Sequence, residues 1–244
     1  MFGRDDNPWA ARFREDCGDF SGIKRRDVDW DNDSLPVEIA YKYVDLEHAA
    51  AVQLGSLKIG TLRSYSRMED DYRSDLNEGL LRRKIRGISF RGDDEKGIAA
   101  AAGFGYDVGG DPGLTVTIQD CVNYEETREA FCFCASRISS SKSLLSGKAQ
   151  AIFRISNFFL LAKLLRAQHR SKFKTVQAGW VHYFRRELVD YENAIDLPAC
   201  LIKEMKYKED YEIRIAFHAA EGIVAEPFIT PPNAEIAALF TRVD

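Results

Sequence analysis

Residues 205–217 read MKYKEDYEIRIAF, and this stretch decides the predicted fold because apolar and polar side chains alternate in its second half. A period of two is typical of a half-buried β-strand. It places Asp210, Glu212 and Arg214 in one row on the polar face, about 7 Å apart per step. Such a row forms either a salt-bridged surface or the polar part of a substrate site. The pattern favours the substrate site.

A strand–helix–strand unit is predicted near the beginning of the chain. Residues 37–43 alternate and predict a strand. The apolar side chains expected to fill the core on this strand are Val37, Ile39, Tyr41 and Tyr43. Asp45 is expected to cap a short helix that runs through Gln53 and stops at Gly55. Residues 57–63 then predict the second strand.

The rest of the chain contains more strands than helices. Further strands are predicted at residues 85–90, 114–118, 131–135, 149–155, 176–184 and 223–229. Helices are predicted from an N-cap at Ser156 to His169 and over residues 235–241, whereas the glycine-rich residues 92–113 indicate a flexible excursion. Strands that mostly follow one another are typical of the α+β class. We therefore predict one α+β domain over residues 36–244, with a split, largely antiparallel β-sheet and flanking helices, after a polar arm over residues 1–35.

Composition is that of a globular protein without a global charge signature. The 244 residues are 45% hydrophobic, the net charge is −4 and the pI is about 5.7. No apolar run has the length of a membrane span, and the N-terminus is too polar for a secretory leader. The cysteine number, five, is odd. These features predict a cytoplasmic protein with reduced thiols and no membrane partner.

Polar side chains of the first and last strands are candidates for a shared cleft. Lys42 has the parity opposite to the apolar residues of its strand, so we expect it to project from the other side of the sheet. Neighbouring strands would bring it together with Thr61 or Ser64 and with Glu212. A cation, a hydroxyl and a carboxylate in one cleft suit a phosphorylated ligand that carries a ribose hydroxyl. A solvent-facing sheet surface is the alternative interpretation.

The sequence predicts no bound metal. Cys132 and Cys134 point to one strand face, but a structural zinc site needs two further ligands at suitable spacing. We expect both cysteines to be buried as small apolar side chains. The histidines are scattered, and only His218 shares the parity of Glu212 and Arg214.

Several short motifs together resemble a bacterial family known only as a domain of unknown function. The resemblance extends over about residues 37–217. The segments that carry it are residues 41–43 (YKY), 55–62 (GSLKIGTL), 75–79 (DLNEG), 131–136 (FCFCAS), 179–183 (GWVHY) and 210–214 (DYEIR). The chain departs from the family pattern at Asp210, where the family carries glutamate. The same skeleton resembles the ADP-ribosyltransferase fold, whose members split NAD at the nicotinamide–ribose bond.

The ADP-ribosyltransferase resemblance implies catalytic roles for two acids. Glu212 would hydrogen-bond the 2′-hydroxyl of the nicotinamide ribose and stabilise an oxocarbenium-like transition state, because a fixed negative charge would lie where positive charge develops. Asp210 would orient the acceptor nucleophile or act as its base.

The same resemblance implies an NAD-binding set. Its members are Lys42, Tyr43, Thr61, Arg63, Ser64 and Arg214. Lys42 or Arg63 would neutralise the pyrophosphate, and Tyr43 or Tyr65 would stack on nicotinamide. These residues come from both ends of the chain, so the assignment requires the first and last strands to meet.

Three functions remain open from the sequence. The leading one is an NAD-dependent ADP-ribosyltransferase that modifies a nucleic acid or protein, in a toxin or anti-phage role; the basic residues 80–91 and 163–174 favour nucleic acid as the acceptor. The second is a non-enzymatic module that binds a nucleotide or nucleic acid on the same fold. The third is a metal-dependent phosphoesterase that uses carboxylates. Its ligands would be Asp75, Glu78, Asp210 and Glu212.

Overall fold

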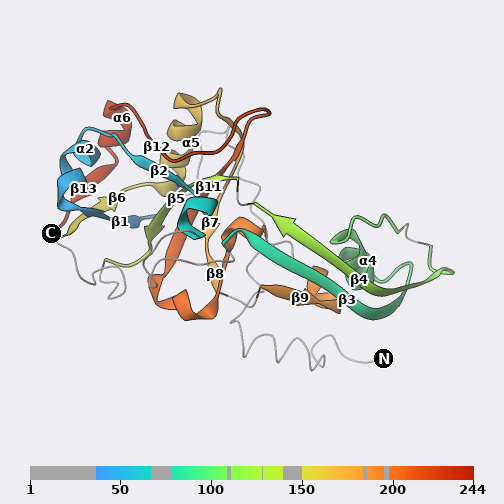
Figure 1. The fold of residues 1–244 in the computed structure, drawn as a ribbon. Coiled ribbons are helices and arrows are strands. Elements are labelled where there is room, and N and C mark those ends of the chain that lie inside the picture. Colours follow the sequence, from blue (N-terminus) through green and yellow to red (C-terminus); the bar gives the residue numbers. More distant parts are fainter. Residues whose placement is uncertain are drawn as a thin grey trace.

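The computed structural model describes residues 37–66, 78–108, 111–127, 129–139, 150–183, 186–194 and 198–244. The predicted polar arm and Asp75 lie outside the described residues. In the described part, the chain forms a main sheet with helices on it and a long arm that extends to one side (Figure 1). None of its described helices has both the length and the apolar character needed to cross a membrane.

The main sheet contains eight strands among the described residues. They are β1 (Ala40–Asp45), β2 (Lys58–Thr61), β5 (Phe131–Ser136), β6 (Gln150–Ile155), β7 (Phe173–Trp180), β11 (Glu212–Ala219), β12 (Phe228–Ile229) and β13 (Phe240–Arg242). Every pairing in this sheet is antiparallel. The predicted α+β class with a largely antiparallel sheet is therefore confirmed.

Strand β5 is the point at which the main sheet divides. One of its edges pairs with β11 along the whole strand, from Phe131 to Ser136. Its other edge pairs with β2 only at the beginning, through Phe131 and Cys132, and with β1 only at the end, where Ser136 meets Tyr41. Because β1 and β2 separate between these contacts, the edge of residues 133–135 is left open to a cavity.

The main core lies under one face of this sheet. Helix α5 (Phe158–Gln168) packs there together with α2 (Ala49–Gln53) and α6 (Ala234–Ala237) (Figure 1). The α5 N-cap is Asn157, whose side chain accepts a hydrogen bond from the Leu160 amide. The prediction of Ser156 was wrong by one residue.

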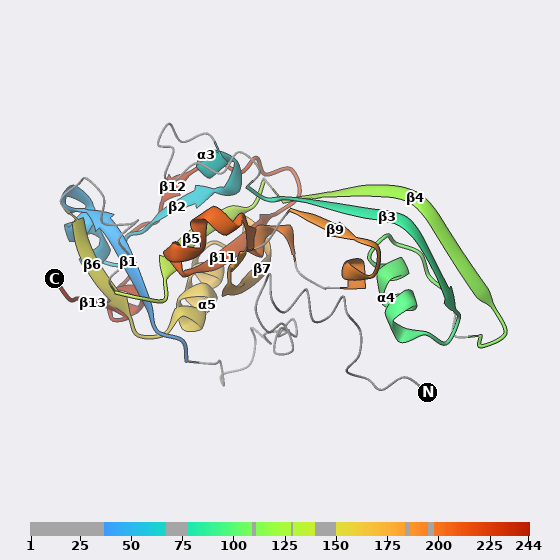
Figure 2. The ribbon, with the colours of Figure 1, turned by 90° about the horizontal axis from the view of Figure 1, so that it is seen from below.

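A three-stranded sheet forms the arm. Its strands are β3 (Leu80–Arg91), β4 (Thr115–Glu126) and β9 (Glu187–Val189), and α4 (Glu95–Ala102) and the 3₁₀ helix η3 (Asp190–Ala194) accompany them. β3 and β4 form an arched antiparallel ribbon with α4 on the inside of the bend (Figure 2). Ile85, Ile88 and Phe90 pack there against α4 as a core of their own.

Short elements connect the arm to the main sheet. They are α3 (Leu62–Ser66), β8 (His182–Tyr183), β10 (Ile202–Lys203) and the 3₁₀ helices η4 (Ala199–Leu201) and η5 (Met205–Asp210), whereas the 3₁₀ helix η2 (Leu46–His48) joins β1 to α2. β8 and β10 pair in parallel, and β10 continues directly toward η5. This arrangement brings Lys203 close to the start of β11.

Several predicted elements need correction. The flexible excursion contains helix α4, because Asp94 caps the helix and an alanine run continues it. The predicted helix over residues 235–241 ends early, and Phe240 belongs instead to β13, which pairs with β6. The face predicted to be apolar on β1 does not fill the core: Val37 is 73% exposed, whereas Ala40, of the same parity as Lys42, is fully buried.

Strand β11 differs from the predicted half-buried strand because both of its faces are covered. Every residue from Glu212 to Phe217 is buried. One face joins the main core, and Ala216 on the other packs with Leu62 and Cys200. Asp210 is not on the strand, because Tyr211 adopts a left-handed conformation (φ 45°) after η5.

Candidate active site

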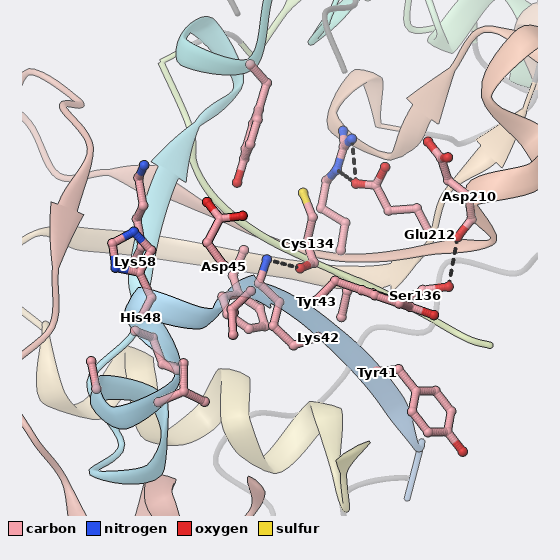
Figure 3. A pocket seen from close by; sticks show the side chains of 18 of the residues that line it. Tyr41, Lys42, Tyr43, Asp45, His48, Lys58, Cys134, Ser136, Asp210 and Glu212 are labelled. Carbon is pink, nitrogen blue, oxygen red and sulfur yellow. Dashed lines mark hydrogen bonds and ion pairs between the residues drawn. The ribbon is translucent and has the colours of Figure 1, made fainter. Parts of the chain in front are cut away.

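A cavity of about 290 Å³ lies where the main sheet divides. Its wall includes the open edge of β5, the strand β1 beside it, and the polar face of β11. Asp45, His48 and Lys58 lie toward one end of the pocket, and Asp210, Glu212 and Ser136 toward the other, with Lys42 between them (Figure 3). The division of the sheet therefore brings strand β1, early in the chain, and strand β11, late in the chain, to one pocket.

Buried charges form the inner end of this pocket. Arg214, which is 1% exposed, donates from Nε to Glu212 Oε1 at 2.8 Å and from Nη1 to Glu78 Oε1 at 2.7 Å. Lys203 Nζ lies 3.0 Å from Glu212 Oε2 and 3.1 Å from Asp210 Oδ2. Arg186 Nη2 lies 3.7 Å from Glu78 Oε1. We call these residues the charge cluster: Glu78, Arg186, Lys203, Asp210, Glu212 and Arg214.

The charge cluster keeps Glu212 ionised. Burial by itself raises the pKa of a carboxyl group, but the adjoining Arg214 and Lys203 outweigh burial and lower the pKa of Glu212 well below its usual range. Conversely, Glu212 and Asp210 overcome the effect of burial and raise the pKa of Lys203. Glu212 therefore cannot act as a general acid near neutral pH, whereas it can present a fixed negative charge.

The acceptor capacity of the Glu212 carboxylate is almost fully used. Arg214 donates to Oε1 through both Nε and Nη2, and Lys203 donates to Oε2. The Cys134 thiol contributes a further hydrogen bond that helps to lower the pKa of Glu212. A thiol is the weakest of these donors, so a ligand hydroxyl would compete with Cys134 rather than with the cations.

Lys42 lines the middle of the pocket. Its Nζ donates to the Cys134 carbonyl at 2.7 Å and lies 4.8 Å from the Phe133 ring centroid. That carbonyl belongs to the open edge of β5, so the lysine occupies the gap between β1 and β5. Tyr43 also lines the pocket, and its hydroxyl donates to the Ile138 carbonyl at 3.0 Å.

Three predicted ligand-binding residues do not line the pocket. The Thr61 amide donates to Ser64 Oγ and the Ser64 amide donates to Thr61 Oγ1, both at 2.9 Å. These reciprocal bonds form a capping box that begins α3. Strand β2 consequently ends at Thr61, so Arg63 lies on α3, where it is exposed and paired with Glu129. The structure therefore does not bring these three side chains into the pocket with Lys42 and Glu212, and their assignment to NAD stays a prediction.

Several members of the site have no strong signal in the amino-acid sequence. Lys203 comes from a two-residue strand, which is too short for its periodicity to be recognised. Arg186 immediately precedes β9, and its Nη1 donates to the Leu80 carbonyl at the base of the arm. The hydroxyl oxygen of Tyr183 accepts a hydrogen bond from the backbone amide of Glu212 at 2.7 Å. It falls within the quoted GWVHY motif, although no role was assigned to it.

The cysteine pair behaves only partly as predicted. Cys132 is buried beside Leu62 and Ala216, whereas Cys134 is half-buried and lines the pocket. Their Sγ atoms lie 3.3 Å apart, with both thiols free. Burial, followed by the neighbouring Cys134, raises the pKa of Cys132 well above its usual range, so its thiol is a poor nucleophile.

The geometry does not favour the metal-dependent phosphoesterase. Among its described ligands, Glu78, Asp210 and Glu212 each face Arg or Lys nitrogens. A divalent cation there would have to displace those cations. Asp45, Glu47 and His48 place ligand atoms within 4.8 Å of one another at the pocket rim. They are largely exposed, and exposed acidic groups are common without an ion.

Comparisons of the chain with protein-family models, with curated proteins and with solved structures found no match. The resemblance to the ADP-ribosyltransferase fold stays a prediction. The pocket itself offers a carboxylate held by two cations at one end, a lysine in the middle, and a rim with charges of both signs at the other end.

Proposed function

We propose that the chain is an enzyme that splits NAD at the nicotinamide–ribose bond and transfers ADP-ribose to a macromolecular acceptor. The observation that carries this proposal is the position of Glu212, buried, ionised and clamped by Arg214 and Lys203 in the same pocket as Lys42. A rigid negative charge is suited to stabilise positive charge that develops in a transition state.

The reaction assigns a distinct part to each group. The bond between the ribose C1′ and the nicotinamide nitrogen breaks with its electron pair leaving on nicotinamide, so positive charge develops on the ribose beside Glu212. The acceptor nucleophile forms the new bond to C1′ and gives up its proton to the Asp210 carboxylate, which acts as the base. Asp210, held by Lys203, is placed to orient that nucleophile. Lys42 supplies the cation for the pyrophosphate.

The volume of the pocket fits part of NAD. About 290 Å³ is at the lower limit of typical small-molecule sites, so it suits a ribosyl base enclosed at the inner end rather than the whole dinucleotide. The remaining nucleotide would extend toward Lys58 and His48 at the rim. The ligand therefore needs both an enclosed part and an exposed part, as NAD has.

The test is incubation with NAD that is labelled separately in nicotinamide and in adenine. We expect nicotinamide release by the wild type and loss of release in Glu212→Gln, while Glu221→Gln, an exposed acid outside the pocket, behaves like the wild type. Folding is checked by circular dichroism because Glu212 is buried. Lys42→Gln, which keeps a donor for the Cys134 carbonyl, should weaken NAD binding about tenfold through loss of one charged hydrogen bond.

Two results would reject or revise the transferase. NAD that neither binds nor releases nicotinamide rejects the nucleotide site. Saturable NAD binding without turnover, unchanged in Glu212→Gln, identifies the alternative, a non-enzymatic nucleotide-binding module. The near-complete use of the acceptor capacity of Glu212 is the specific observation that favours this second function.

A further inference from the structure

The outer face of the arm is a surface that does not contribute to the pocket. Strands β3 and β4 run side by side for 12 residues each, which corresponds to about 40 Å. Helix α4 covers only the inside of their bend (Figure 2). The cross-strand pairs on the opposite face are Leu80 with the exposed Glu126, Arg82 with Tyr124, Lys84 with Val122, Gly87 with Gln119, Ser89 with Thr117 and Arg91 with Thr115. The register skips Arg86, which is exposed between the Ile85 and Gly87 pairs.

Strand β3 is rich in Arg and Lys, although the chain as a whole has a negative net charge. The 12 residues of β3 contain five Arg or Lys and no acid, although the net charge of the whole chain is −4. Arg82 pairs with Glu187, and Arg91 pairs with Asp93. Within the described residues, Lys84 and Arg86 form no ion pair. The Asp190 carboxylate accepts hydrogen bonds from the backbone amides of Arg86 and Gly87, and it forms no ion pair with the Arg86 guanidinium.

The remaining side chains of this face are of the kinds that contact nucleic acids. Tyr124 is 67% exposed, with the Arg82 guanidinium 5.9 Å from its ring centroid. Ser89 and Thr117 place their hydroxyl oxygens 3.2 Å apart across the two strands. Hydroxyl, amide and cationic groups provide most hydrogen bonds to phosphate and sugar oxygens. A two-stranded β-ribbon is also narrow enough for the major groove of a duplex, about 12 Å wide.

We infer that the outer face of the β3–β4 ribbon docks the sugar–phosphate backbone of a nucleic acid, with Lys84 and Arg86 as phosphate contacts and Tyr124 as an exposed aromatic contact. The inference deepens the proposed function, on which it rests for the identity of the reaction, by naming the class of acceptor. Docking itself does not depend on NAD chemistry.

The base of the ribbon lies beside the pocket, so a nucleic acid docked on the ribbon would be close to the proposed catalytic residues. Glu78, two residues before β3, binds Arg214 in the charge cluster. Arg186, next to β9, contacts both Glu78 and the Leu80 carbonyl. A backbone held along the ribbon would therefore lead toward the inner end of the pocket, where Glu212 and Asp210 lie.

The test measures binding by fluorescence anisotropy with a labelled DNA duplex of about 20 base pairs, two helical turns. Single-stranded DNA, single-stranded RNA and duplex RNA serve as parallel probes that identify the preferred form. Lys84→Glu and Arg86→Glu should each weaken binding about tenfold near 0.1 M salt. Each should lower the slope of log affinity against log salt by about 1. Tyr124→Ala should weaken binding without changing that slope.

The matched control is Lys96→Glu, the same charge change at an exposed position of α4, on the other side of the ribbon. Its affinity should remain that of the wild type. Docking on the outer face is refuted if Lys96→Glu weakens binding as much as Lys84→Glu. It is equally refuted if none of the four probes binds the wild type in a salt-dependent manner.

The outcome is separable from that of the proposed function. Nicotinamide release in the absence of nucleic acid reports the NAD reaction alone. If release occurs and the ribbon does not bind, the docking inference fails and the transferase stands. If the ribbon binds and no nicotinamide is released, the transferase fails and docking stands. With both intact, Lys84→Glu should lose label transfer to nucleic acid while it keeps nicotinamide release.

Discussion

Arg214 connects the two sides of the charge cluster, so it is the side chain whose removal should have the largest effect on stability. It binds Glu212, Glu78 and the Cys200 carbonyl with no exposure to solvent beyond 1%. Arg214→Met removes the closest cation from two buried carboxylates, leaving Glu212 with Lys203 and Glu78 with the more distant Arg186, which costs about 3 kcal/mol in the free energy of unfolding. Urea unfolding measures this loss.

Two variants show whether the effect of Arg214→Met comes from uncompensated charge. Arg170→Met, at an exposed position after α5, should change the free energy of unfolding by less than about 0.5 kcal/mol. Adding Glu78→Gln and Glu212→Gln to Arg214→Met should recover part of the loss, because both carboxylates that lost the Arg214 guanidinium are then neutral and Lys203 keeps Asp210 as its partner. A triple variant less stable than Arg214→Met would contradict this explanation.

His182 should make stability depend on pH in the mildly acidic range. Burial lowers its pKa to about 4, compared with about 6.5 in an unfolded chain. Between these values the unfolded state binds more protons, so the free energy of unfolding falls as pH falls from about 6.5 to about 4, by about 3 kcal/mol from this group. His182→Gln should flatten the profile by that amount in urea titrations at several pH values.

Some site residues could be predicted from the sequence and others could not. The alternation in DYEIR brought Glu212 and Arg214 to one face, and the structure places both in the pocket with Lys42. Their roles toward NAD stay predictions. Lys203 joins them through the parallel pairing of β10 with β8, a contact between segments about twenty positions apart. No local pattern carries that information.

Helix α3 begins with its capping box, so the loss of either hydroxyl group should destabilise the helix. Thr61→Ala and Ser64→Ala should each lower the free energy of unfolding by about 1 kcal/mol. Because the two bonds are reciprocal, the double variant should lose clearly less than the sum. Ser171→Ala, at an exposed turn, serves as the control. NAD affinity should be unaffected, since neither side chain lines the pocket.

Gly97 decides how closely α4 approaches the ribbon. Alanine is usually preferred to glycine inside a helix by about 1 kcal/mol. Here a Cβ would lie 2.1 Å from Cγ of the buried Phe90, so overpacking costs about 1–3 kcal/mol and outweighs that preference. Gly97→Ala should therefore lower the midpoint of thermal unfolding. Addition of Phe90→Leu should recover part of it, and an increase in the midpoint for Gly97→Ala alone would contradict the packing.

Elements with strong local signals were predicted, and those set by tertiary contacts were not. The apolar stripe of α5 and the positive φ of Gly55 after α2 agree with the sequence. Strand β13 was assigned to a helix because its three residues become a strand only by pairing with β6. The glycine-rich segment concealed α4, whose Asp94 cap and alanine run are a helix signal that outweighs Gly97.

The described part of the chain contains separate apolar cores, which pack against different elements. The main core lies between the central strands and α5, whereas the core of the arm rests on one helix and a ribbon whose other face is exposed. The charge cluster joins the two parts through Glu78 and Arg186. The sequence predicted a single domain but could not show this division, since β3 and β9 meet across about a hundred positions.

This division predicts unequal hydrogen exchange along the chain. Regions with little apolar burial open locally, at a lower free energy than global unfolding. Amides of α4 and the distal β3–β4 ribbon should therefore exchange at least about tenfold faster than amides of β5 and β11. The two central strands are expected to open only when the whole main sheet unfolds. Mass spectrometry of peptides from residues 95–102 and 212–219 measures the difference. Equal protection of both peptides in the free protein would show that the two cores unfold as one unit. If docking occurs as inferred, a bound DNA duplex should slow hydrogen exchange in the ribbon and leave exchange in α5 unchanged.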